Sequence, residues 1–324
     1  MIDRFGRKID YVRISVTDRC NLRCCYCMPE EGVPMVDHED ILRYGEIVKL
    51  AEIFASLGIE KIKLTGGEPL VRKDLWQLTK KLKEIPGIRQ VTLTTNGILL
   101  KEQMRELAQA GIDGVNISLD TLREEEYYQI SRRRELKRAW EGLQEALKYP
   151  EVTVKINCVP MGQDTESLLE IGALAKDYPV HVRFIEMMPI GLGKEWKGKT
   201  EKEIKELLEN RFGRCRPFQG VLGNGPGHYI SFEGFQGKIG FISAVSHKFC
   251  SSCNRIRLTS QGYLKSCLQY DIGEDLREPL RRGEPEEKIK ALIVKAIEKK
   301  PEGHMFGLAN KENQEQKIMS QIGG

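Results

Sequence analysis

The sequence has no long hydrophobic run. No segment approaches the ~20 consecutive apolar residues that cross a bilayer, and the N-terminal stretch MIDRFGRKIDYVRIS is charged where a secretory signal peptide needs an apolar segment. We therefore expect a cytoplasmic protein without a membrane partner. Because thiols stay reduced in that compartment, the nine cysteines predict metal or redox sites in place of a disulfide framework.

A strong charge of one sign is also lacking. The chain has 51 Lys and Arg against 47 Asp and Glu, a formal net charge of +4, with acids and bases interleaved. This balance argues against a protein that coats nucleic acid, and it leaves room for a local basic pocket that binds phosphates. With 324 residues, 40% of them hydrophobic, the chain is long enough for one large domain or two ordinary ones.

Short strand patterns alternate with amphipathic helix patterns over the first two-thirds of the chain. The strand patterns lie at 11–17, 61–65, 91–95, 114–120, 152–159 and 180–187. Helix-like segments such as 40–58 and 101–112 lie between them. Repeats of this kind form parallel strands with helical crossovers, and they are fewer than a closed TIM barrel requires. The predicted fold class is α/β, a partial (β/α)6 barrel of the TIM type, with a doubly wound sheet as the alternative.

The pattern changes after about residue 195. Residues 200–212 read as a helix with Thr200 as N-cap and Glu203 in the capping-box position. A glycine-rich, β-like stretch follows, and a further helix pattern lies at 285–300. We predict two domains, a barrel over residues 1–210 and an α+β domain over residues 211–324.

Cys20, Cys24 and Cys27 form a C-x3-C-x2-C motif directly after the first predicted strand. Three thiolates on a short loop can ligate three irons of a 4Fe–4S cluster and leave the fourth iron open for an exchangeable ligand. Zinc would need a fourth protein ligand, and the nearest downstream histidine is His38. The loop is too polar for buried structural thiols, and Cys25 is left over as a bystander.

The stretch CNLRCCYC, with its aromatic residue before the last cysteine, and the downstream TGGEP resemble the radical S-adenosylmethionine superfamily. The resemblance implies a 4Fe–4S cluster whose open iron is chelated by S-adenosylmethionine, and an electron that cleaves this cofactor to methionine and a 5′-deoxyadenosyl radical. Gly66 and Gly67 allow the backbone to approach the cofactor closely. Glu68 offers an acceptor to the methionine amino group.

A second group, Cys250, Cys253 and Cys267, has the spacing C-x2-C-x13-C. The residues between the last two read as a hairpin that returns Cys267 to the first pair. Taken alone, this group fits zinc, with His247 as the candidate fourth ligand, as well as it fits an iron–sulfur cluster. Beside the first group, a second 4Fe–4S cluster with an open iron is the stronger interpretation.

Both cysteine spacings, the CMPEEG stretch, the NRIR after the second cysteine pair and the terminal IGG together resemble the GTP 3′,8-cyclase family of molybdenum cofactor biosynthesis. The resemblance covers almost the whole chain. It implies two 4Fe–4S clusters, with the substrate purine on the open iron of the second. It also implies hydrogen abstraction from the ribose C3′ of GTP and attack of the carbon radical on guanine C8, giving (8S)-3′,8-cyclo-7,8-dihydroguanosine 5′-triphosphate.

The resemblance also assigns binding residues, and no catalytic side chain beyond the cluster and cofactor ligands. Contacts to S-adenosylmethionine are expected from Tyr26, Gly67, Ser118 and Met188, and contacts to GTP from Arg13, Lys63, Thr94, Lys155, Arg255 and Arg257. Arg255 and Arg257 alternate on one strand and so face one side, where a guanidinium fork matches a phosphate. Lys63 has the charge of an arginine without that fork. Gly323 and Gly324 correspond to a tail that reaches into the active site.

The resemblance further implies partners: GTP, a flavodoxin- or ferredoxin-like reductant, a cyclic pyranopterin monophosphate synthase that takes the product, and a second copy of the chain in a homodimer. Nucleic acid is not expected. Two alternatives stay open. One is a peptide-modifying radical S-adenosylmethionine enzyme with two clusters, although such enzymes usually carry more C-terminal cysteines. The other is a zinc-dependent RNA-binding protein, which the weak net charge and the lack of aromatic–basic interleaving disfavour.

Overall fold

The computed structural model describes residues 1–34, 36–220, 222–306 and 314–323. Its first six strands are parallel and adjacent in chain order: β1 (Tyr11–Ser15), β2 (Lys61–Thr65), β3 (Gln90–Thr95), β4 (Gly114–Ser118), β5 (Thr153–Cys158) and β6 (His181–Ile185). The helices between them are α1 (Tyr44–Ser56), α2 (Leu75–Lys83), α3 (Leu100–Gln109), α4 (Glu124–Ser131), α5 (Leu136–Ala146) and α6 (Thr165–Asp177). The predicted partial (β/α)6 barrel is therefore confirmed.

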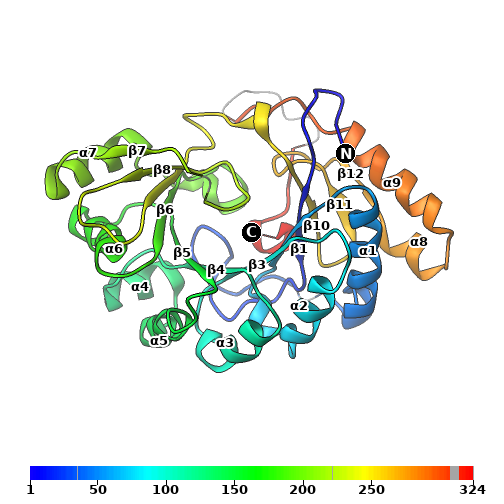
Figure 1. Cartoon of the computed structure of the whole chain (residues 1–324), viewed down its shortest axis with the longest axis horizontal. Coiled ribbons are helices and arrows are strands. Elements are labelled where there is room, and N and C mark those ends of the chain that lie inside the picture. The colour runs from blue at the N-terminus through cyan, green and yellow to red at the C-terminus, as the bar shows by residue number, and fades with distance from the viewer. Residues whose placement is uncertain (35, 221, 307–313, 324) are drawn as a thin grey trace.

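The helices α1–α6 follow the outer side of a curved sheet, while its inner side faces the middle of the molecule (Figure 1). A doubly wound sheet would carry helices on both faces, so that alternative is wrong. The hydrophobic core lies between the helices and the outer side of the strands. It includes Ile47, Leu50 and Phe54 from α1, which are fully buried against β1 and β2 residues such as Val12 and Ile62.

The C-terminal part of the chain extends both edges of this sheet. The remaining strands are β7 (Arg216–Phe218), β8 (His228–Ser231), β9 (Ile239–Ile242), β10 (Arg255–Leu258), β11 (Tyr263–Lys265) and β12 (Gly273–Asp275). The sheet order is β12-β11-β10-β1-β2-β3-β4-β5-β6-β9-β8-β7. Both β9 and β10 run parallel to the barrel strands that they pair with. Strands from late in the sequence thus flank β1 on one side and β6 on the other.

The remaining elements are the helices α7 (Glu201–Phe212), α8 (Arg277–Arg281), α9 (Glu286–Glu298) and α10 (Met319–Ile322), and the short 3-10 helices η1 (His38–Asp40), η2 (Pro69–Val71), η3 (Gly191–Glu195) and η4 (Cys250–Ser252). The predicted capping box of α7 is present, because Thr200 Oγ1 accepts from the Glu203 amide and Glu203 Oε2 accepts from the Thr200 amide. Helix α9 packs on β12 and α1. Helix α10 lies inside the curve of the sheet (Figure 1).

The structure refines the helix predicted over 40–58. Residues 38–40 form η1, and α1 begins at Tyr44, where the Glu46 carboxylate reaches back to accept from the Arg43 amide at 2.7 Å. That bond satisfies a backbone donor just before the helix and fixes its start. The helix ends at Ser56, and Gly58, which has a φ of +89°, begins the turn into β2.

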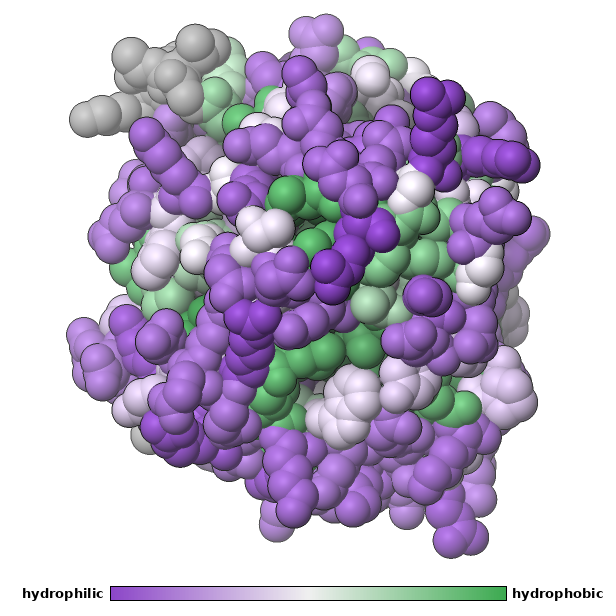
Figure 2. Space-filling model, turned by 90° about the vertical axis from the view of Figure 1, so that its left-hand side faces the viewer, coloured by the Kyte–Doolittle hydropathy of each residue, from purple (hydrophilic) through white to green (hydrophobic). Residues whose placement is uncertain are grey.

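No helix among the described residues is long and apolar enough to cross a membrane. Seen from the side that carries α6 and α7, the surface is mostly hydrophilic, with hydrophobic side chains visible between the polar ones near the middle (Figure 2). Large hydrophobic side chains with more than a third of their area exposed are scattered along the described chain, from Ile2 to Met305.

Candidate active site

A cavity of about 520 Å³ runs along the inner side of the parallel strands and includes their carboxyl ends. Its wall combines the loop after β1, the TGGE stretch after β2, the ends of β3, β4 and β5, and the segment after β6. Strand β10 contributes Arg255 and Arg257 from the far end of the sequence. This is the end at which barrel enzymes place their reactive groups, because the βα loops converge there.

The three cysteines of the first motif share this wall, and Cys25 does not. Cys20, Cys24 and Cys27 line the cavity. A tight turn in which the Cys27 amide donates to the Cys24 carbonyl at 2.9 Å places the last two side by side. The Cys25 amide is instead bound to the carbonyl of Ile130 in α4 at 2.9 Å, which ties the loop to the outer helix layer. Cys25 therefore stands apart from the other three cysteines, and their assignment as ligands stays a prediction.

Burial dominates the environment of these thiols. Burial is the main cause that raises the pKa of Cys20 to about 11 and that of Cys27 to about 12, and it raises the pKa of Cys24 as well. Neighbouring thiols and the Glu68 carboxylate add to the effect. As free side chains they stay protonated at neutral pH. Thiolates become stable in this loop when a cationic centre compensates their charge, since metal binding displaces the thiol protons.

The zinc alternative can be compared with the positions of the described side chains. Among the described residues, no three His, Cys, Asp or Glu side chains are close enough to hold a single metal ion. Zinc requires such convergence, whereas a 4Fe–4S cluster takes each cysteine at a different iron. The candidate zinc ligand His247 has an exposed ring whose Nδ1 lies 3.7 Å from Glu201 Oε2. His247 thus has an acidic partner of its own, and the choice between zinc and a cluster at the second cysteine group stays a prediction.

Gly66 and Gly67 lie against the backbone of the cysteine loop. A Cβ on Gly67 would stand 2.4 Å from the Arg19 carbonyl oxygen, and one on Gly66 would stand 2.6 Å from that of Thr17. The Gly67 amide also donates to the Thr17 carbonyl at 2.8 Å. Glycine is therefore required at both positions because the loop after β2 packs closely on the cysteine loop. The backbone at these two residues is left bare of side chains in the cavity wall.

The next residue, Glu68, is buried and fully engaged. Its carboxylate accepts from Thr95 Oγ1 at 2.7 Å, from the Asn96 amide at 2.6 Å and from the Leu70 amide at 3.0 Å. Burial nevertheless raises its pKa to about 7. The predicted role of Glu68 as an acceptor for an amino group fits this position, because a cationic partner would offset the cost of a buried carboxylate.

The residues expected to contact S-adenosylmethionine converge on the same space. Tyr26, Gly67, Ser118 and Met188 all line the cavity. The Tyr26 hydroxyl donates to Asp120 Oδ2 at 2.9 Å, and Asp120 Oδ1 accepts from the Val159 amide at 2.8 Å. Burial raises the pKa of Asp120 to about 6. Sequence reasoning missed Asp120, although its place directly after a strand in NISLD was a usable signal.

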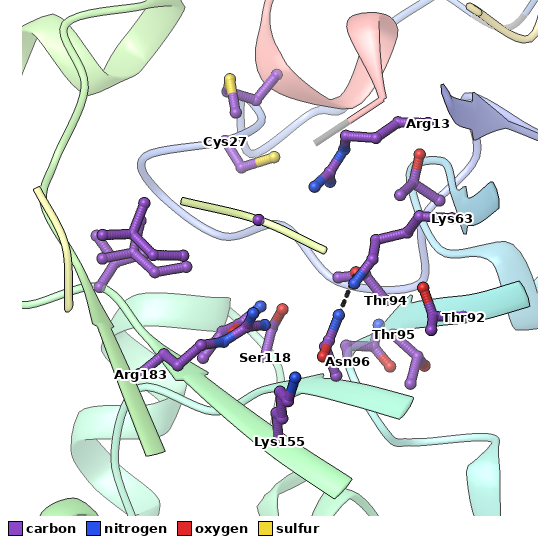
Figure 3. A pocket seen from close by; sticks show the side chains of 18 of the residues that line it. Arg13, Cys27, Lys63, Thr92, Thr94, Thr95, Asn96, Ser118, Lys155 and Arg183 are labelled. Carbon is purple, nitrogen blue, oxygen red and sulfur yellow. Dashed lines mark hydrogen bonds between the residues drawn. The ribbon is translucent and has the colours of Figure 1, made fainter. Parts of the chain in front are cut away.

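The residues expected to contact GTP form rows across the sheet. Arg257, Arg13 and Lys63 are register partners on β10, β1 and β2. Thr94 and Lys155 lie in a second row, on either side of Asn116. Both rows face the cavity, and Figure 3 shows Arg13, Lys63 and Lys155 pointing into a common space. The structure thus brings together all six predicted residues.

The cationic side chains of this wall are buried and repel one another, and a bound anion would stabilise them. Burial is the main cause that lowers the pKa of Lys155 to about 7, and the Arg183 charge adds to it. The pKa of Lys63 and that of Arg257 are lowered in the same way, by burial and then by neighbouring guanidinium groups. A polyanion would offset both the burial of these positive charges and their mutual repulsion. The wall therefore favours a phosphate-bearing ligand.

Arg183 is a basic wall residue that sequence reasoning missed. It lies in the middle of β6, is 9% exposed, lines the cavity and donates to Asn157 Oδ1 at 2.9 Å. Ser118, Asn157 and Arg183 form a third row across β4, β5 and β6. The signal in the sequence was a charged residue between Val182 and Phe184 in a strand pattern.

The second cysteine group stands beside this wall and is held by cations. Among the described residues, the cavity lining includes Arg255 and Arg257 but not Cys250, Cys253 or Cys267. The antiparallel pairing of β10 with β11 confirms the predicted hairpin, and it carries Cys267 back toward the first pair. The Cys253 amide donates to the Cys250 carbonyl at 3.1 Å.

The Cys253 thiol differs from those of the first loop. Burial raises its pKa, but the charges of Lys300 and Arg255 and an Arg255 hydrogen bond outweigh burial and lower the pKa to about 6. Lys300 is 2% exposed and donates to the carbonyls of Arg255 at 2.8 Å and Ser266 at 2.6 Å. The positive charges of Lys300 and Arg255 would stabilise Cys253 as a thiolate, the form that binds a metal centre.

The C-terminal segment approaches the basic wall as far as its last described residue, Gly323. The Gly323 carbonyl accepts from Arg257 Nη1 at 2.9 Å and from Thr65 Oγ1 at 3.4 Å. Gly323 has a φ of +79°, and a Cβ would stand 3.0 Å from Ser15 Cβ, so the position requires glycine. Gly324, the other predicted tail residue, lies outside the described residues.

Fold and site together define a radical S-adenosylmethionine protein. The family model described as Radical SAM superfamily matches residues 14–175, and the one described as Molybdenum Cofactor Synthesis C matches residues 180–306. A solved structure with a similar fold is that of SuiB from Streptococcus suis bound to S-adenosylmethionine, with a TM-score of 0.63 and 15% identity over 84% of this chain and 64% of that one.

Relatives with higher identity narrow the family. The chain is 43% identical over 325 residues to a GTP 3′,8-cyclase from Clostridium perfringens, and 44% identical over 328 residues to one from Heliobacterium modesticaldum, with all of each chain covered in both comparisons. A GTP 3′,8-cyclase from Pelotomaculum thermopropionicum is 45% identical over 329 residues, again with complete coverage. The chain belongs to the GTP 3′,8-cyclase family.

Proposed function

We propose that this chain is a radical S-adenosylmethionine enzyme that converts GTP to (8S)-3′,8-cyclo-7,8-dihydroguanosine 5′-triphosphate, the first step of molybdenum cofactor biosynthesis. The observation that carries the proposal is a single cavity whose wall combines a three-cysteine loop with six basic side chains. Full-length similarity to curated enzymes named for this reaction supports it. Similarity to SuiB shows the fold alone and gives a peptide substrate no support.

The first cysteine loop would hold one 4Fe–4S cluster. Cys20, Cys24 and Cys27 would be its ligands, and the backbone strip at Gly67 would receive S-adenosylmethionine beside it. When bound, the cluster and this cofactor supply the radical chemistry that breaks a ribose C–H bond. The chain would orient the two groups through Tyr26, Ser118 and Met188, and the surrounding cavity wall would limit the access of water to the reacting atoms.

The basic rows would bind the triphosphate of GTP. Lys155 donates to the Leu222 carbonyl at 3.0 Å, Arg257 to the Gly323 carbonyl and Arg183 to the Asn157 amide oxygen, all of them neutral acceptors. Their positive charge is therefore left for a ligand. Arg13, Lys63 and Arg255 would complete the phosphate site, with Thr94 as a neutral donor in the same wall.

A second 4Fe–4S cluster would be held by Cys250, Cys253 and Cys267. Because Arg255 follows Cys253 in β10 and lines the cavity, this cluster would stand next to the phosphate-binding wall. Its open iron would then be available to the purine of GTP. The buried Lys300 ammonium supports the assignment, since a cation offsets the negative charge of a thiolate-bound cluster.

The proposed reaction implies partners outside the chain. A low-potential one-electron donor of the flavodoxin or ferredoxin kind would reduce the first cluster, and a cyclic pyranopterin monophosphate synthase would take the product. We further propose a cytoplasmic location and a homodimer, and we propose that residues 1–210 and 211–324 act as the barrel and the second-cluster domain.

The proposal is tested by anaerobic incubation of the reconstituted protein with a reductant, S-adenosylmethionine and GTP. We expect 5′-deoxyadenosine and a cyclised GTP in equal amounts, both absent in a Cys24→Ser variant. The iron content should be about eight per chain. Cofactor cleavage that leaves GTP unconsumed would contradict the proposed substrate, and protein that binds zinc in place of iron would contradict the chemistry altogether.

A further inference from the structure

A buried ion pair joins the C-terminal segment to the hairpin that carries Cys267. Lys265 lies at the end of β11, two residues before that cysteine, and its ammonium group contacts the carboxylate of Glu315. The side chains of both partners are 1% exposed. Lys265 also lies 3.4 Å from Asp271, but this carboxylate is half exposed. Within the described segment 314–323, Glu315 is the residue whose side chain forms an ion pair with the rest of the protein.

Backbone contacts place Glu315 firmly on the hairpin. Its amide donates to the Gln269 carbonyl at 2.7 Å, and Gln314 forms an antiparallel bridge with Tyr270. Glu315 Oε1 accepts from the Lys317 amide at 2.8 Å, which turns the chain toward the cavity. The segment therefore has a fixed origin directly beside the second cysteine group.

From that origin the segment runs into the active site. Met319 lines the cavity, Ser320 is buried, and Gly323 ends at Arg257 and Thr65. At its tip the segment is held by the hydrogen bonds to the Gly323 carbonyl and by the fully buried Ile322. These contacts form only when the base of the segment is in the register that brings Gly323 to Arg257.

We propose that Lys265 and Glu315 are positioning residues that seat the C-terminal tail over Arg257 and thereby orient this arginine toward the triphosphate. A buried ion pair adds little net stability but strongly disfavours any register that separates its charges. Such a pair suits the C-terminal segment, because its Gly323 carbonyl must reach the guanidinium group of Arg257. The proposal deepens the proposed function, since the triphosphate is the ligand that Arg257 is assigned to bind.

The pair also links two sites that are distant in sequence. Lys265 is the register partner of Arg257 across β10 and β11. One end of the tail therefore sits on Lys265, and the other end sits on the guanidinium group of its cross-strand partner. If the hairpin around Cys267 moved, the contacts of the tail with Lys265 and with Arg257 would both change. The position of the tail therefore depends on whether the second cysteine site is formed.

The first test measures the tail itself. Hydrogen–deuterium exchange of peptides that cover 314–323 is compared between the wild type, Glu315→Gln and Lys265→Met. We expect protection of the tail to be lost in both variants, with unchanged exchange in β1–β6. Glu298→Gln, at an exposed position of α9, is the matched control and should exchange like the wild type. Full protection in both pair variants would overturn the proposal.

The second test asks whether the two residues act as a unit. If they do, the double variant Lys265→Met/Glu315→Gln should weaken GTP binding no more than the worse single variant, about 10- to 100-fold. Binding of S-adenosylmethionine and the iron content should stay at wild-type levels, whereas a general loss of folding would lower both. Additive losses in the double variant would overturn the pairing. If the wild type itself fails to bind GTP, the proposed function fails, while the exchange result still decides the role of the pair.

Discussion

Arg257 on β10 lies directly opposite Arg13 on β1 in a parallel pair of strands, although the two residues come from opposite ends of the chain. Lys63 on β2 continues the row. Arg257 is 9% exposed and Lys63 is 7% exposed. Burial, and then repulsion from neighbouring cations of the cavity wall, lowers the pKa of each of the three. The row is a binding surface whose favourable state includes an anion.

Replacement of Arg257 by lysine tests this row. The lysine keeps the charge but loses the planar fork and the bond to the Gly323 carbonyl. We expect GTP affinity to fall about 10- to 100-fold, the equivalent of a charged hydrogen bond, with unchanged iron content. Arg138→Lys, on the exposed side of α5, is the control. Anaerobic equilibrium dialysis measures both, and equal affinity in the two variants would contradict the assignment.

Lys155 predicts a pH dependence of GTP binding. Burial, and then the Arg183 charge, lower the pKa of Lys155 to about 7 in the free protein, and a bound polyanion raises it again. The contribution of Lys155 is therefore complete below that pKa and declines as the pH rises through it, by up to tenfold per pH unit. His181, its neighbour on β6, has a pKa that burial and the Lys155 charge lower to about 4, so it stays neutral in this range.

The measurement compares GTP dissociation constants of the wild type and Lys155→Arg over the neutral range. The guanidinium group stays charged throughout, and the ratio of the two constants cancels the titration of GTP itself. We expect the ratio to change in favour of the arginine variant above neutral pH. A ratio that is independent of pH would show that Lys155 does not contact the triphosphate.

Gly67→Ala should disturb the first cysteine loop. The added methyl group would stand 2.4 Å from the Arg19 carbonyl, so the loop must shift, at a cost of about 1–3 kcal/mol in the free energy of unfolding. The iron content should drop because the ligands move with the loop. Gly45→Ala is the matched control, since nothing lies within 4 Å of its Cβ and it occupies the first turn of α1. Thermal unfolding and iron analysis would show the contrast, and equal behaviour of both variants would contradict the packing argument.

Lys300→Met should affect the second cysteine group. The methionine fills the space but leaves the Arg255 and Ser266 carbonyls without their donor and removes the charge near Cys253. We expect about half of the bound iron to be lost, with the first cluster retained. Lys299→Met, which removes an exposed contact to Glu274, is the neighbouring control. Full iron content in the Lys300 variant would show that the cation is dispensable for cluster binding.

The sequence predicted the strands of the barrel well, because each is a short apolar run followed by a recognisable loop. All six predicted strands are present within about two residues of their expected ends. The cysteines of the first motif, Gly67 and the basic residues assigned from the resemblance lie on one cavity wall, whereas the second cysteine group stands beside it. Local patterns were enough here because the predicted site residues lie on or directly after the parallel strands, which all border the same cavity.

Other features depend on contacts that no local pattern contains. The pairing of β10 with β1 and of β9 with β6 joins segments that are far apart, and a hairpin motif does not indicate which edge it will meet. Arg183 was not singled out from the sequence, because a strand pattern alone does not show which side of the sheet faces a cavity. The buried Lys265–Glu315 pair was hidden because the two residues stand on separate segments. The boundary at residue 210 stays a prediction.

The position of β1 has a consequence for synthesis on the ribosome. Strand β1 is made first, but one of its two edges is covered only by β10. Until residues 255–258 have emerged, the nascent barrel has a bare strand edge bordered by the unoccupied cysteine loop, and such edges invite pairing with other chains. Translation that stalls before this point would thus yield an aggregation-prone fragment, so a chaperone would have to protect the edge of β1 until β10 has emerged.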